Sequence, residues 1–207
     1  MEQEKKSSFR TLLLSVLFSA SGPIVLGLGL LVGHSSTQIA DFTRRTAELL
    51  ALIVALAVYA VTSRRTDMAQ EQKKALERKG NLFTGVIMCV SGLSMLVLAV
   101  LSTDGDKGNV VPAMAIAFLG VVANSIFWRR YTTLARTQDS SILSVQARLY
   151  GAKTAVDVCV TSALAAVLAF PGTGISYWLD KAGTAIVSLY MIRCGIKTIR
   201  EQLRISQ

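Results

Sequence analysis

Residues 39–63 read IADFTRRTAELLALIVALAVYAVTS, and this stretch decides the fold class. Its second half is almost entirely apolar, and the whole stretch exceeds the roughly 20 residues that an α-helix needs to cross a bilayer. Its first half carries four charged side chains: Asp41, Arg44, Arg45 and Glu48. Positions spaced by three and four residues share one face of a helix, so the stretch predicts a membrane-spanning helix with a charged stripe.

Five further windows have a similar apolar character. The six windows are 11–33, 39–63, 82–102, 110–128, 154–172 and 177–196. The composition agrees, because 52% of the residues are hydrophobic and 17% are charged, whereas soluble domains have about 25% charged residues. We therefore predict an all-α polytopic membrane protein with six transmembrane helices. We expect one transmembrane domain over residues 1–207 and no soluble domain.

The basic residues are distributed unevenly between the two sides of these windows. Seventeen of the 22 Lys and Arg residues lie before the first window, in the second and fourth connections, or near the C-terminus. The opposite side receives only Lys107 and Lys181. Cytoplasmic loops carry such an excess, so we predict that the N and C termini are both cytoplasmic, in the cell (inner) membrane. The net charge of +9 is thus a topology signal that also attracts membrane lipids, and nucleic-acid binding is not expected.

Charges inside the windows are the candidate functional residues. Each one costs about 2.5–3.5 kcal/mol at the centre of a membrane helix, so a charge that is present there indicates a polar pathway or an ion network. The candidate substrate- or ion-binding residues are Asp41, Arg44, Glu48, Lys153 and Asp157. Supporting polar residues are Arg45, Asn124, Thr161 and Ser162. For Asn124 a hydrogen bond between helices is favoured over contact with a ligand.

The pairing of these charges stays open at the level of sequence. Arg44 with Glu48, and Lys153 with Asp157, have the spacing of one helical turn and can neutralise each other within a helix. In both pairs the base comes first, which is the weaker orientation and suggests partners on other helices. A cross-helix arrangement, with Arg44 near Asp157 and Glu48 near Lys153, is equally compatible with the charges.

At these residues the chain resembles the cation diffusion facilitator (cation efflux) family of antiporters. In that family the second span typically reads L-A-D-A-x-H-S-x-x-D, and residues 39–48 here read IADFTRRTAE. The fourth span of the family ends with an Asn and a following Arg pair, as in Asn124, Arg129 and Arg130. Residues 178–197, WLDKAGTAIVSLYMIRCGIK, are similar to the sixth span of the family and are the most specific part of the resemblance.

The resemblance implies a site that differs from that of the family. Members bind zinc or a related divalent ion through a pair of acidic or His residues on span two and another on span five. Those positions fall here on Arg44 and Glu48, and on Lys153 and Asp157, or on Leu149 and Lys153 if a small gap is placed. Arg is not a metal ligand and Lys ligates only when it is deprotonated, so no residue is assigned to a metal with assurance.

The predicted function is therefore secondary transport of the cation/proton antiport type, with an altered substrate site that contains Arg and Lys. The resemblance implies alternating access, with protons competing for the site against a small cationic solute or ion, including a divalent metal. No cofactor is expected. A homodimer is compatible with the resemblance, although we expect this chain to have no counterpart of the cytoplasmic domain that supports the dimer in the family.

The alternative is a non-transporting membrane scaffold or accessory subunit, in which the same charges form a permanent intramembrane ion network. An enzyme is not expected, because the sequence contains no nucleophile–His arrangement, phosphate-binding loop or HExxH motif.

Overall fold

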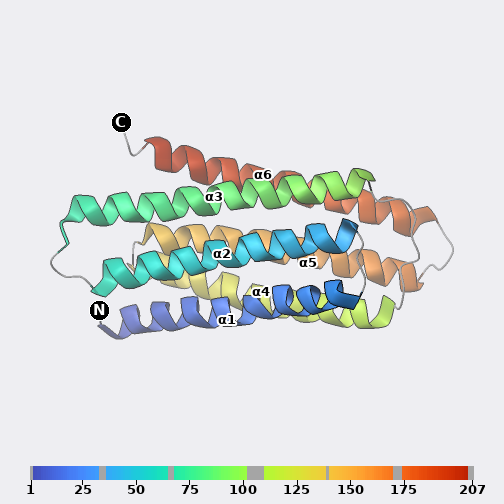
Figure 1. Ribbon diagram of the computed structural model, residues 1–207, viewed down its shortest axis with the longest axis horizontal. Helices are drawn as coiled ribbons and strands as arrows, with labels where there is room; N and C mark the ends of the chain where they lie inside the picture. The colour runs from blue at the N-terminus through green and yellow to red at the C-terminus, as the bar shows by residue number, and fades with distance from the viewer. Residues whose placement is uncertain are drawn as a thin grey trace.

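The computed structural model describes residues 2–32, 36–64, 68–101, 110–138, 140–169 and 174–204. These residues form six helices that lie along a common direction in an elongated bundle (Figure 1). The helices are α1 (Glu2–Val32), α2 (Ser36–Arg64), α3 (Gln70–Leu101), α4 (Val110–Gln138), α5 (Ser141–Ala169) and α6 (Gly174–Arg204). The prediction of an all-α fold with six helices is confirmed.

The helices are longer than the apolar windows in the sequence. They contain 29 to 32 residues, which at 1.5 Å per residue corresponds to about 43–48 Å, against about 30 Å for the hydrocarbon core of a bilayer. The excess lies mostly at one end, where α3 begins at Gln70 and α5 begins at Ser141. The basic connection between α2 and α3 thus largely continues the helices, as its lack of Pro and of Gly before Gly80 predicts.

Three helices are long and apolar enough to cross a membrane, by length and composition, within the described part of the chain. The segments are Lys5–Val25, Phe42–Ser63 and Gln70–Val97. Rows of exposed large apolar side chains on α1, α3, α4 and α6 fit a surface that faces lipid. The chain is therefore a polytopic membrane protein, while the other three spans and the side on which the termini lie stay predictions.

Helix α5 occupies the centre of the bundle. It contacts α2, α3, α4 and α6, and Val158 is the one exposed large apolar side chain among its described residues. Helix α1 packs against α2 and α4, and α3 runs alongside α6 (Figure 1). The residues on α5 are consequently the ones best placed to meet side chains from several other helices.

The contact between α3 and α6 is made close by glycine. A Cβ atom added to Gly195 would lie 2.7 Å from the carbonyl oxygen of Gly85 and 2.6 Å from the sulfur of Cys89. A Cβ atom on Gly92 would lie 2.9 Å from the carbonyl oxygen of Ser188. Because backbone atoms cannot move aside as a side chain can, these glycines let two helices approach at van der Waals distance.

This close contact predicts a specific sensitivity to a single methyl group. We expect Gly195→Ala to lower the free energy of unfolding by about 1–3 kcal/mol, the usual cost of overpacking. Thermal unfolding in detergent micelles measures the change. Gly80→Ala is the matched control, because its added Cβ would contact only the side chain of Val58. Equal melting temperatures for the two variants would contradict the assignment.

Candidate functional site

Glu48 on α2 is the meeting point of the charges inside the bundle. Its Oε1 accepts a hydrogen bond from Nη1 of Arg44 at 3.0 Å, and its Oε2 lies 3.3 Å from Nζ of Lys153 on α5. The side chains are 3%, 11% and 13% exposed for Glu48, Arg44 and Lys153 respectively. One carboxylate thus engages a cation of its own helix and a cation of another helix, one at each oxygen.

This arrangement resolves the alternatives that the sequence left open. The intrahelical pair Arg44–Glu48 and the cross-helix pair Lys153–Glu48 are both present. Within the described residues, Asp157 forms an ion pair with neither Lys153 nor Arg44. Lys153 turns instead toward Glu48, and its ammonium group lies 5.1 Å from the ring centroid of Tyr150, a cation–π contact.

Asp157 is held by an amide rather than by a cation. Nδ2 of Asn124 on α4 donates a hydrogen bond to Oδ2 of Asp157 at 2.5 Å, so Asn124 does link two helices. Gly120 lies one turn before Asn124, and a Cβ atom there would be 2.8 Å from the same oxygen. The absence of a side chain at Gly120 is therefore what lets α4 approach the carboxylate of Asp157.

Arg45 and Asp41 belong to the part of α2 that is near α1. The side chain of Arg45 packs over Gly22, where a Cβ atom would lie 3.3 Å from its Cδ. Arg45 thus contacts α1 through the space at Gly22. Asp41 is on the same helix, but its side chain lies outside the described residues.

The two hydroxyl residues predicted as supporting groups do not join this site. Oγ1 of Thr161 donates a hydrogen bond to the backbone carbonyl of Asp157 at 2.7 Å, so it is engaged within its own helix. Ser162 is exposed on the outer surface of α5. Both lie one turn or more beyond the charged residues along the helix, and neither hydroxyl points to the carboxylates.

The structure adds a cluster of hydroxyl groups that the sequence analysis missed. Oγ of Ser15 lies 2.7 Å from the hydroxyl of Tyr131 on α4, and Oγ of Ser19 lies 3.2 Å from the hydroxyl of Tyr150 on α5. The two tyrosine rings stack with centroids 5.3 Å apart. The spacing of four residues in Thr11, Ser15 and Ser19 could have revealed this polar face of α1.

This hydroxyl cluster, made of Ser15, Ser19, Tyr131 and Tyr150, connects α1 to α4 and α5 directly beside the charges. Tyr150 belongs to both groups, since its ring lies under Lys153 and its hydroxyl reaches α1. The side chains of Ser15, Tyr131 and Tyr150 are fully buried. Buried hydroxyls of this kind are satisfied only while the three helices keep their relative positions.

The described side chains do not form a complete set of ligands for a divalent metal. Among the described residues, no three His, Cys, Asp or Glu side chains gather in a group that could hold a metal ion. Both oxygens of Glu48 already have cationic partners, and the formal charges of Arg44, Lys153, Glu48 and Asp157 cancel. A divalent ion would therefore enter a region where these four charges already cancel, and of the two carboxylates only Glu48 forms an ion pair among the described residues.

Comparison with known proteins places the whole bundle in one group. The family model described as the cation efflux transmembrane domain matches residues 12–205, which include every charged residue of the site and the hydroxyl cluster. No curated protein matches the chain.

The two carboxylates are expected to differ in their contribution to stability. Glu48→Gln should lower the free energy of unfolding by about 3–5 kcal/mol, because it leaves two buried cations without their carboxylate. Asp157→Asn should cost about 1 kcal/mol, because an amide can still accept the hydrogen bond from Asn124. Denaturant titration of both variants in detergent gives the two values. A cost for Asp157→Asn as large as that for Glu48→Gln would show that Asp157 is part of the ion network.

The hydroxyl cluster predicts an effect of single oxygen atoms. Tyr150→Phe keeps the ring under Lys153 but removes the hydroxyl and leaves Ser19 without this partner, which should cost about 1 kcal/mol of stability. Tyr190→Phe is the control, because the side chain of Tyr190 is exposed. The change is read from thermal unfolding in detergent. A loss of the same size in both variants would mean that the buried contact contributes nothing beyond general effects of the substitution.

Proposed function

This chain belongs to the cation efflux family, and on that premise we propose that it is a secondary transporter that exports a cation in exchange for protons. Family membership supports a cation transporter of the cation diffusion facilitator kind. The finer elements of the proposal are the antiport, the roles of the Arg and Lys residues, and the cytoplasmic location of both termini.

The observation that carries the proposal is the unequal treatment of the two intramembrane carboxylates. Glu48 is bound by Arg44 and Lys153, whereas Asp157 has a hydrogen bond from Asn124 and no ion pair among the described residues. We assign Asp157 as the carboxylate that binds the transported cation, with Asn124 and the space at Gly120 shaping the site. Glu48 has a different role, since it fixes the two resident cations.

The proposed coupling follows from the carboxylate of Asp157, which forms no ion pair among the described residues. A bound cation and a bound proton neutralise the same carboxylate, so each excludes the other. Protonated Asp157 can donate its O–H or accept the Asn124 hydrogen bond, and it then has no charge to hold the cargo. Proton binding from one side of the membrane would therefore release the cation, and loss of the proton on the other side would restore the site.

The packing indicates which helices would move in alternating access. The α3–α6 pair is joined through glycine contacts at backbone distance, which favours its movement as a unit. Helices α1, α2, α4 and α5 are linked to one another by the ion pair of Glu48 with Lys153 and by hydrogen bonds between hydroxyl and amide side chains, which favours their movement together. We propose that these four helices rock relative to the α3–α6 pair and expose Asp157 to each side in turn.

A scaffold without transport would use the same Arg44–Glu48–Lys153 network. It would not need, however, a second buried carboxylate such as Asp157 that forms no ion pair with a described residue, because each charge inside a membrane protein is costly. Family membership also favours transport over the scaffold.

Flux measurements in proteoliposomes test the proposal. Purified protein is reconstituted with an internal pH indicator, and proton movement is recorded after addition of Zn²⁺, Na⁺ or K⁺ on one side. We expect at least one of these cations to drive proton movement. In Asp157→Asn that flux should fall to the level of empty liposomes while the melting temperature changes little.

Glu71→Gln is the matched control, because it also removes one carboxylate, at an exposed position at the start of α3. Its flux should equal that of the unaltered protein. Full flux in Asp157→Asn would refute the assigned role of Asp157. Absence of cation-dependent flux from well-folded protein, across metals, alkali ions and organic cations, would refute antiport.

A further inference from the structure

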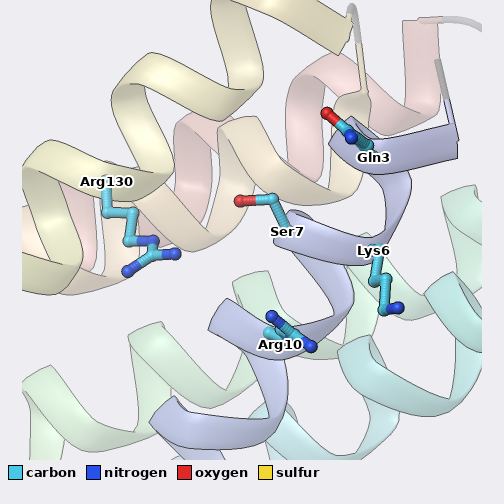
Figure 2. A pocket seen from close by; sticks show the side chains of 5 residues that line it. All are labelled: Gln3, Lys6, Ser7, Arg10 and Arg130. Atoms are coloured by element: carbon cyan, nitrogen blue, oxygen red, sulfur yellow. The ribbon is translucent and has the colours of Figure 1, made fainter.

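We propose that the protein binds one phospholipid with an anionic headgroup in a groove between the start of α1 and the end of α4. The groove has a volume of about 350 Å³ and is lined by Gln3, Lys6, Ser7, Arg10 and Arg130. Figure 2 shows the guanidinium of Arg130 on α4 directed toward the face of α1 that carries Ser7 and Arg10. The inference does not depend on which solute is transported.

The charge of the groove selects the ligand. Three of its five lining side chains, Lys6, Arg10 and Arg130, are cations, and none is acidic. None of the three forms an ion pair within the part of the chain that the structure describes. Gln3 and Ser7 add uncharged hydrogen-bond donors. Such a group of donors from two helices matches the oxygens of a phosphodiester, to which Arg binds with two parallel hydrogen bonds.

A second groove of similar volume contains a basic residue, Arg148, whose charge is neutralised within the protein. It lies between α4, α5 and α6, and Arg148 is among its lining residues. Both terminal nitrogens of Arg148 are paired with the carboxylate of Glu201, one of them at 3.1 Å. The protein thus supplies its own anion at Arg148, whereas no described carboxylate forms an ion pair with Lys6, Arg10 or Arg130 of the groove beside α1.

The surface beyond the groove is apolar, as the binding of an acyl chain requires. On α1, Leu14 and Leu17 follow Arg10 at helical spacing and are 51% and 61% exposed. On α4, Ile126 lies one turn before Arg130 and is 59% exposed. The rings of Phe18 and Phe127, 6.2 Å apart, close the space between these two helices. The acyl chain of a lipid whose headgroup lies in the groove would therefore lie along an apolar surface formed by α1 and α4.

The position along the helices agrees with the headgroup level of a bilayer. The apolar segment of α1 that can span a membrane begins at Lys5, so Lys6 and Arg10 lie in its first two turns. Trp128, a residue type enriched at the membrane interface, lies just before Arg130 and is exposed. Basic pockets between transmembrane helices at this depth are typical sites for anionic lipid headgroups. A free phosphate would pair with the cations but would make no contact with the apolar surface of α1 and α4.

Lipid titration followed by native mass spectrometry tests the inference. Delipidated protein in detergent is mixed with phosphatidylglycerol or with phosphatidylcholine of the same acyl chains. We expect one phosphatidylglycerol to bind with clear preference. In Lys6→Gln/Arg130→Gln the affinity for phosphatidylglycerol should fall about tenfold or more, because each of the two basic residues contributes to the binding of an anionic headgroup.

The control variant is Lys5→Gln/Arg129→Gln, which removes the same two residue types at adjacent exposed positions that do not line the groove. Its affinity for phosphatidylglycerol should change less than twofold. Equal losses in both double variants would overturn the inference and indicate general attraction to a basic surface. If the pocket double variant does not fold, the single variant Arg130→Gln carries the same test against Arg129→Gln.

Inorganic phosphate distinguishes the two sources of the same chemistry. An excess of phosphate should leave the bound phosphatidylglycerol in place, because the apolar surface of α1 and α4 contributes to lipid binding and not to phosphate binding. Displacement of the lipid by phosphate would assign the groove to a free anion. Equal binding of phosphatidylcholine would show that the groove does not read headgroup charge, and would overturn the inference.

Discussion

The ion contacts of Glu48 are the interaction on which the arrangement of the helices depends. A carboxylate in the middle of a membrane protein is tolerated only when its charge is compensated, and here Arg44 and Lys153 compensate it from two helices. Because Lys153 reaches across to Glu48, α2 and α5 are held in one register. Tyr150 lies under Lys153 and joins α1 through Ser19, so the same contact also orders the hydroxyl cluster.

The contacts of this network give Glu48 and Asp157 different surroundings. The resemblance places the family's two pairs of metal-binding residues on spans two and five, and at those positions Arg44 and Lys153 are cations that both bind Glu48. Asp157 is left with an amide partner on α4 and with the space that Gly120 provides. The proposed transport site is consequently asymmetric. It has one carboxylate to exchange between a proton and a cation, next to the group of Glu48, Arg44 and Lys153, whose formal charge is +1.

The contact between α3 and α6 differs in kind from the contacts that α5 makes with its neighbours. The α3–α6 contact places backbone against backbone through Gly85, Gly92 and Gly195, and it leaves little freedom. The contacts around α5 combine apolar packing with polar side chains from neighbouring helices, and the polar side chains can change partners. A groove lined by basic residues lies where α1 meets α4, at the edge of the proposed moving part. An anionic lipid in that groove would bind both helices at once.

The sequence by itself determined the six helices, the membrane class, the family and the identity of the charged residues, because apolar length and helical spacing are local properties. It also pointed to Asn124 as a link between helices. Only the tertiary structure decided that Lys153 pairs with Glu48 and leaves Asp157 to an amide, since both choices satisfy the same charges. The contacts of Tyr131 and Tyr150 with α1 also depend on which helix faces meet. Contacts between residues more than one hundred positions apart are fixed by packing, which no local pattern encodes.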